Sequence, residues 1–160
     1  MGTLDLSGAQ KLENSDIRRR DRWGTAADRK PVAELRSISK ITANLRAAWK
    51  DLAVNVSEPN IFHEPWFLEP GLKHFCTDPD QQLFLLWAGE PNHSVLLGLL
   101  PIGPTNRFGR WPVPHIQNWA HHNSFLGTPL VRSEYETKFW TALLDKLDGC
   151  NWQGFLHLNS

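Results

Sequence analysis

Several residue types are scarce in this chain, and each scarcity excludes something. The 160 residues include only two cysteines, one methionine and one tyrosine, and 17 basic residues are balanced by 17 acidic ones. Cys76 and Cys150 are too few for a disulfide framework, which favours a reducing compartment, so we predict a cytoplasmic protein. A net charge of zero gives no whole-chain field that would attract nucleic acid or anionic lipid, so we predict no nucleic-acid partner.

Long apolar runs are also missing. No stretch approaches the roughly 20 apolar residues that a membrane-spanning helix requires, and we predict no membrane span. The N-terminus reads Met-Gly-Thr-Leu-Asp-Leu-Ser and lacks the basic and then apolar succession of a signal peptide. With 41% hydrophobic and 21% charged residues, the composition is instead that of a globular domain with its own core.

Tryptophan is abundant, with eight residues against a single tyrosine. Because tryptophan is highly buried on average, the first interpretation is a core and a sheet face that use it as a packing residue. The second interpretation is an aromatic-lined pocket for a sugar or an acyl group. The sequence leaves both interpretations open.

The chain divides into a flexible polar leader, residues 1–31, and one domain, residues 32–160. Apolar residues at three- and four-residue spacing predict helices, and short continuous apolar runs predict buried strands. Residues 35–41 fit a short strand or a turn of helix. The other expected helices cover 45–56, 61–76 and 133–148, and the other expected strands cover 83–88, 95–100, 115–120, 126–131 and 152–158. Hairpins among helices predict an α+β fold with a mixed, largely antiparallel sheet flanked by helices.

The clearest predicted element is the hairpin from Gln82 to Ile102. Its two strands are apolar on both faces, which is typical of a sheet covered on both sides. Gly98 lies in the middle of the second strand, and a glycine inside a strand often marks the close approach of another group. We therefore expect a neighbouring element or a ligand against Gly98.

Capping residues predict where the helices begin and end. Pro65 suits the first turn of a helix, and the pair Pro70-Gly71 predicts that this helix is short or kinked. Ser133 and Glu136 have the spacing of a capping box, which places the start of the last helix directly after Ser133. Gly149 is expected to end that helix in the left-handed conformation.

A group of polar and aromatic residues lies in and after the expected strand 115–120. His115, His121 and His122 are close in sequence, but no cysteine or carboxylate accompanies them, and adjacent histidines on a strand point to opposite faces. We therefore expect no metal site. Imidazole titrates near neutrality, so one of these rings can act as a base or contact a substrate. The candidate substrate-binding residues are Trp119, His121, His122 and Asn123.

Other chemically active residues lack a recognisable motif. Glu64 precedes a proline-led helix start, where a negative charge suits the helix dipole, so the pair His63-Glu64 needs no catalytic role. Neither cysteine has the flanking residues of a nucleophile, and Ser124 does not lie in a G-x-S-x-G elbow. No glycine loop of the common phosphate-binding types is present. The catalytic residues are therefore left unassigned.

Short segments of the chain occur in a familiar order. They are Trp49-Lys-Asp-Leu52, Asn60-Ile-Phe-His-Glu-Pro-Trp-Phe-Leu68, Leu83-Phe-Leu-Leu-Trp-Ala88, Leu97-Gly-Leu-Leu-Pro-Ile102 and Leu126-Gly-Thr-Pro-Leu-Val131. Together they resemble the N-terminal half of the GNAT-like acetyltransferases of the CelD type, relatives of the FemAB peptidyltransferases. The resemblance covers about residues 40 to 160. It implies a GNAT-like half-domain and a link to exopolysaccharide or cellulose biosynthesis.

The last of these segments departs from the family pattern. Where the family often has an Asp-Tyr pair before its Pro-Leu, this chain reads His122-Asn-Ser-Phe-Leu-Gly-Thr-Pro-Leu130. Phe125 takes the aromatic position, and the acidic residues are absent. If this loop contacts the substrate, the substrate or the activity differs from that of the family.

The resemblance implies the attack of an amine on an acyl-CoA thioester. The implied donor is acetyl-CoA or another acyl-CoA, and the implied acceptor is a small-molecule or sugar-linked amine. GNAT proteins bind the CoA pyrophosphate with an R/Q-x-x-G-x-G/A segment before a helix, and this sequence contains no such segment.

The cofactor-binding residues are then expected outside this chain, in a C-terminal half of the same domain beyond Ser160. On this hypothesis the chain is inactive alone. The alternative is a non-catalytic carbohydrate-binding or scaffold module that uses its tryptophans as stacking platforms.

Overall fold

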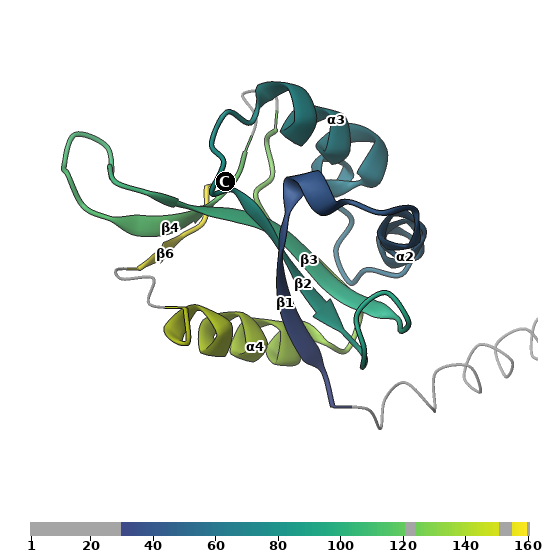
Figure 1. Cartoon of the computed structure of the whole chain (residues 1–160). Helices are drawn as coiled ribbons and strands as arrows, with labels where there is room; N and C mark the ends of the chain where they lie inside the picture. Colours follow the sequence, from purple (N-terminus) through teal and green to yellow (C-terminus); the bar gives the residue numbers. More distant parts are fainter. Residues whose placement is uncertain (1–29, 121–123, 151–154, 160) are drawn as a thin grey trace, which may run out of the picture.

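A computed structural model describes residues 30–120, 124–150 and 155–159 of the chain. Its elements, in chain order, are β1 (Val32–Ser37), η1 (Ile38–Lys40), α2 (Ala43–Ala53), η2 (Ile61–His63), α3 (Pro65–Phe75), β2 (Gln82–Trp87), β3 (Leu96–Thr105), β4 (His115–Asn118), β5 (Leu130–Val131), α4 (Glu136–Asp148) and β6 (Leu156–His157) (Figure 1). The leader up to residue 29 and the start of the last expected strand, residues 152–154, lie outside the described residues.

The strands form one mixed sheet. β1, β2, β3 and β4 are antiparallel neighbours in that order, and β5 pairs antiparallel with the first half of β3. β6 pairs with β4 in parallel, after the crossover through α4. This arrangement confirms the α+β class with a mixed, largely antiparallel sheet flanked by helices.

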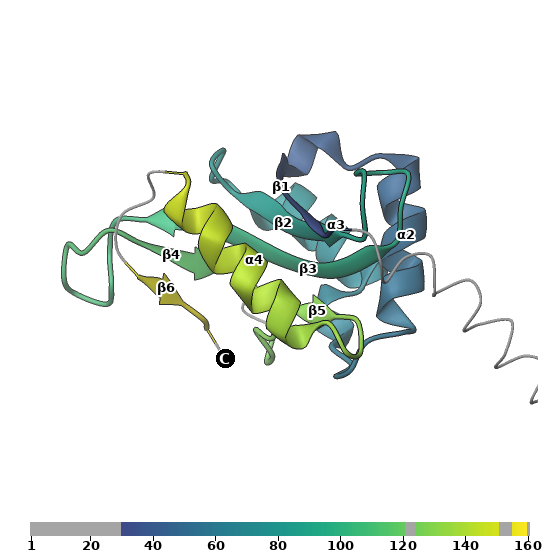
Figure 2. The ribbon, with the colours of Figure 1, turned by 90° about the horizontal axis from the view of Figure 1, so that it is seen from below.

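Helices cover both faces of the sheet. α2 and α3 lie on one face and α4 lies on the other (Figures 1 and 2). Successive residues of β2 alternate between the two layers, because Leu83 and Leu85 pack with α2 and α3 while Phe84 and Leu86 pack with α4. The double-sided burial predicted for the hairpin is therefore confirmed.

Gly98 lies beneath α4, the helix that covers this side of β3. A Cβ atom at this position would lie 2.2 Å from Cδ2 of Phe139, so the ring needs the space that the missing side chain leaves. The same ring packs edge-on against Phe84, with 5.3 Å between centroids. The close neighbour that the sequence predicted for Gly98 is thus the Phe139 ring of α4.

The ends of α4 differ from the prediction. The helix begins at Glu136 with Tyr135 at the N-cap position, and no side chain caps it. Glu134 adopts a left-handed φ of 74°, and this turn delays the helix so that Ser133 cannot cap it. Gly149 has a φ of −76° and keeps a helical hydrogen bond, so the predicted left-handed stop is also wrong.

Pro65 lies in the first turn of α3 as predicted, but the helix starts there and not at residue 61, because Ile61–His63 forms the separate turn η2. The predicted interruption is wrong, because the helix continues through Pro70 to its end. Leu68 and Leu72 are buried on either side of the proline, and this packing compensates for the helical hydrogen bond that proline cannot donate.

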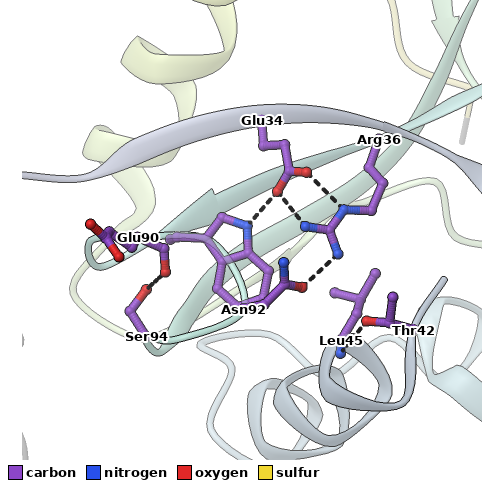
Figure 3. A network of polar contacts seen from close by, with 8 residues as sticks. Glu34, Arg36, Thr42, Leu45, Glu90, Asn92 and Ser94 are labelled. Carbon is purple, nitrogen blue, oxygen red and sulfur yellow. Dashed lines mark hydrogen bonds and ion pairs between the residues drawn. The ribbon is translucent and has the colours of Figure 1, made fainter. Parts of the chain in front are cut away.

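A polar network joins the edge strand β1 to the connection between β2 and β3 (Figure 3). The Glu34 carboxylate accepts hydrogen bonds from the Arg36 guanidinium at 2.7 and 2.8 Å and from the Trp87 indole at 3.0 Å. Arg36 also donates to Asn92 Oδ1 at 2.8 Å, and Asn92 lies in the connection with a φ of 63°. The buried charge of Arg36 is therefore paired within the network.

Candidate functional site

β4 and β5 both pair antiparallel with β3, β4 with its second half and β5 with its first half. The chain between them interrupts this pairing. The Trp119 amide donates to the Pro101 carbonyl at 2.9 Å, and the pairing with β3 resumes at Leu130. Of the residues between these pairs, the described ones, 120 and 124–129, do not pair with β3; the segment 120–129 is called the excursion below. Three of the four predicted substrate-binding residues, His121, His122 and Asn123, fall in this excursion and lie outside the described residues.

A buried asparagine ties the excursion to the end of β4. Asn118 Nδ2 donates to the carbonyl oxygens of Gly127 at 2.9 Å and Asn159 at 3.2 Å, and its Oδ1 accepts from the Asn159 amide at 2.6 Å. Gly127 packs so tightly that a Cβ there would overlap the Asn159 carbonyl oxygen. The carboxyl ends of the parallel strands β4 and β6 thus meet the returning limb of the excursion.

The segment before α3 also binds residues 126–128 of the excursion. Asn60 Nδ2 donates to the carbonyl oxygens of Thr128 at 2.7 Å and Leu126 at 3.2 Å. His63 is 2% exposed, and its ring hydrogen-bonds to the backbone of Thr128. Burial lowers the pKa of His63 to about 4, so this imidazole is neutral at physiological pH.

Trp119 is the predicted site residue that the structure describes. Its half-buried side chain packs against the core cluster formed by α2, α3 and the sheet. A Cβ added to Gly71 of α3 would lie 3.1 Å from Cη2 of this indole. The absence of a side chain at Gly71 therefore lets the ring pack closely against α3. Trp119 therefore serves the packing of the excursion against α3, in agreement with the interpretation of tryptophan as a core residue.

Aromatic side chains from η2, α3 and the excursion form a partly exposed surface. The ring pairs Phe62–Phe67, Phe62–Phe125 and Trp66–Phe67 pack edge-on with centroids 5.2 to 5.8 Å apart. Trp66 is 64% exposed and Phe125 is 75% exposed. The sequence did not predict this surface, although most of its rings belong to the segment 60–68 that carries the family resemblance.

Cavities lie beside α3. The larger is an open cavity of about 560 Å³, within the range of small-molecule sites, and it is lined by residues of η1, α2, α3 and the segment that leads into β2. A second cavity of about 420 Å³ shares with it the Arg46–Glu69 ion pair and Lys73. Cys76 lines the larger cavity, and burial raises the pKa of its thiol. No sequence motif had indicated these cavities.

The N-terminus of the crossover helix α4 is occupied by a carboxylate of the chain itself. Hydrogen bonds from its own backbone amide and from the Ser57 hydroxyl hold the pKa of Glu136 below its ordinary value. A helix N-terminus attracts negative charge, and Glu136 lies in the first turn of α4.

Metal-binding clusters and membrane-spanning helices are both absent from the described residues. No group of three or more His, Cys, Asp or Glu residues among them could hold a metal ion. Within the same ranges, no helix has the length and apolar character needed to cross a membrane.

No protein-family model and no curated protein matches this sequence. Among solved structures, the fold is similar to the crystal structure of aminoglycoside antibiotic 6'-N-acetyltransferase AAC(6')-Ih from Acinetobacter baumannii. The similarity has a TM-score of 0.48 at 11% sequence identity, and it covers 82% of this chain and 80% of that chain.

Proposed function

We propose that this chain is the acceptor-binding part of a cytoplasmic, GNAT-like, acyl-CoA-dependent N-acyltransferase that acts in exopolysaccharide or cellulose biosynthesis. The acceptor is a small-molecule or sugar-linked amine, and the donor is acetyl-CoA or another acyl-CoA. The amine nitrogen attacks the thioester carbonyl, the carbon–sulfur bond breaks, and an amide forms. A base takes the proton of the amine, and CoA leaves as the thiol.

One observation carries the proposal: the segments of the family resemblance are joined by direct contacts. The Trp49 indole donates to the His63 carbonyl at 2.8 Å, which links the first segment to the second. Asn60 and His63 both bind the backbone of Thr128, which links the second segment to the last. Contacts of this kind explain why the segments occur as an ordered set, and they support the GNAT-like part of the proposal.

The acyl donor is held, in this proposal, by the C-terminal half of the same domain. One feature supports this division, because the sequence has no R/Q-x-x-G-x-G/A segment. The acceptor is then bound at the excursion 120–129, where His121, His122 and Asn123 contact the amine and Trp119 supports them.

Ligand titrations of the full chain test the proposal. Isothermal titration with acetyl-CoA is expected to show no saturable binding. An amino-sugar oligosaccharide is expected to bind at least tenfold more tightly than its neutral hydroxyl counterpart, measured by tryptophan fluorescence. Trp119→Phe should weaken this binding, whereas Trp111→Phe, in an exposed loop, serves as the matched control and should leave it unchanged.

The outcomes separate the parts of the proposal. Tight binding of acetyl-CoA would overturn the division between donor and acceptor halves. An unchanged affinity in Trp119→Phe, with the fold intact by thermal melting, would place the acceptor elsewhere. Absence of any amine binding would contradict the acceptor role itself.

A second candidate function is a non-catalytic carbohydrate-binding or scaffold module. The exposed aromatic surface around Trp66 and Phe125 favours it, because flat exposed rings are suitable for stacking on sugars. This candidate predicts equal affinity for the neutral and the amino oligosaccharide. It also predicts that Trp66→Ala, and not Trp119→Phe, abolishes the binding.

A further inference from the structure

Two histidines face each other at the parallel end of the sheet. His115 begins β4 and His157 ends β6, and the pairing of Gln117 with His157 places both rings on one face of these strands. Their ring centroids lie 5.9 Å apart, with 64° between the ring planes. The alternate residues Ile116 and Leu156 pack in the cluster under α4, so the two imidazoles lie on the opposite face of the sheet.

Aromatic rings enclose this pair. Phe155 stacks flat on His115, with 4.7 Å between centroids and 5° between planes. Phe108, from the connection between β3 and β4, packs edge-on against His115 at 5.5 Å and against His157 at 5.2 Å. His115 is only 2% exposed, so its ring is removed from bulk water.

Each ring has a buried nitrogen with no hydrogen-bond partner among the described residues. His115 Nδ1 lies 3.0 Å from the Val113 carbonyl oxygen, which can only accept, so Nδ1 carries the proton and Nε2 has a free lone pair. Neither His115 Nε2 nor His157 Nδ1 has a hydrogen-bond partner in the part of the chain that the structure describes. A histidine that binds a metal commonly donates its other ring N–H to a backbone carbonyl, as His115 does.

The surroundings limit which ion two such nitrogens can bind. The described residues hold no group of three or more metal-binding side chains, so they offer no tetrahedral zinc site. A divalent charge in an aromatic enclosure without a carboxylate would also be costly, and a monovalent ion costs less. Copper(I) accepts imidazole nitrogen and forms two-coordinate complexes. With metal–nitrogen bonds of about 2 Å, two imidazoles that share one ion have ring centroids about 6 Å apart when the arrangement is near linear.

We propose that His115 Nε2 and His157 Nδ1 form a two-coordinate site for copper(I), buried between Phe108 and Phe155. The site lies at the parallel strands and is independent of the acyl transfer proposed above. Binding leaves copper in the +1 oxidation state. Both nitrogens then donate their lone pairs to the ion as its ligands.

Copper(I) titration against a chromogenic chelator, under anaerobic conditions, tests this site in the full chain. Thiols also bind copper(I), so the background is the Cys76→Ser/Cys150→Ser variant. We expect one equivalent of copper(I) per chain and a raised melting temperature. X-ray absorption should show two nitrogen ligands. His157→Gln in the same background should lose the bound ion, and His93→Gln, which changes an exposed histidine, should retain it.

Either of two results would overturn the proposal. One is no uptake by the cysteine-free background, and the other is equal uptake by the background and His157→Gln. His115→Gln provides a second test, and far-UV circular dichroism establishes that each variant is folded. The His157→Gln result stands alone if His115→Gln does not fold, because His157 is less buried than His115.

Discussion

Among single residues, His63 couples the stability of the fold to pH. Burial lowers its folded pKa to about 4, against about 6.5 for the unfolded chain, so the unfolded state binds the proton more readily. The free energy of unfolding should be highest above pH 6.5 and should fall by about 3 kcal/mol between pH 6.5 and pH 4. Urea denaturation across this pH range measures the slope.

The variant His63→Gln should lose this part of the pH dependence, whatever its stability at pH 7. His74→Gln, which changes an exposed histidine at the end of α3, is the matched control and should keep the slope. A slope that survives in His63→Gln would show that other groups cause the loss of stability in acid.

Gly98 is the second residue with a testable role. Gly98→Ala places a Cβ against the Phe139 ring, and overpacking of this kind costs about 1–3 kcal/mol of unfolding free energy. Gly149→Ala is the control, because no heavy atom lies within 3.4 Å of the added Cβ. The double variant Gly98→Ala/Phe139→Leu should lose less stability than the sum of the single changes. Additive losses in chemical denaturation would contradict a direct contact.

At the scale of elements, two helix starts give opposite expectations for similar substitutions. Thr42 Oγ1 accepts a hydrogen bond from the Leu45 amide at 3.2 Å and caps α2, so Thr42→Ala should lower stability by about 1 kcal/mol. Ser133→Ala should change little, because Ser133 does not cap α4. Thermal or chemical denaturation of both variants compares them. An equal loss of stability in both variants would show that Ser133 caps α4, as the sequence predicts.

The sequence predicts well the elements whose signal lies within the element itself. The apolar runs of β2 and β3 and the spacing of Leu45, Trp49 and Leu52 in α2 determine burial locally, and these elements are present. The excursion 120–129 was less predictable, because it is shaped by Asn60 and Asn118, which are distant in sequence. Segment 126–131 was predicted as one strand, but its first residues bind these asparagines and only Leu130–Val131 pair with β3.

The candidate site was predictable only in part for the same reason. Trp119, His121, His122 and Asn123 were chosen because polar and aromatic residues are dense in the sequence there, and their role in binding stays a prediction. The partnership of His115 with His157 was not predictable, since a parallel pairing after a helical crossover brings together strands 40 residues apart in the chain. The capping box at Ser133 failed because a left-handed Glu134 has no clear signal in the sequence.

At the scale of the whole molecule, the two ends of the sheet are held by different kinds of contact. β2 and β3 lie between helices on both faces. Residues 83–87 of β2 and 96–102 of β3 are all buried. β4 and β6 are short, and their outer end depends on the hydrogen bonds of Asn118 with Gly127 and Asn159. Only Ile116 and Leu156 of these two strands pack in the core cluster under α4, so this end should open without unfolding of the core.

Amide hydrogen exchange measures this difference. In the unchanged chain, amides of β2 and β3 should exchange only through global unfolding, and those of residues 124–128 and 155–159 should exchange faster. Asn118→Ala removes hydrogen bonds worth about 1 kcal/mol each, so exchange at both segments should rise several-fold while β2 and β3 stay protected. Asn55→Ala removes an exposed asparagine bond at the end of α2 and should leave both segments unchanged. If Asn118→Ala instead accelerates exchange in β2 and β3 to the same degree, the sheet opens as one cooperative unit, and the excursion 120–129 cannot move independently of the core.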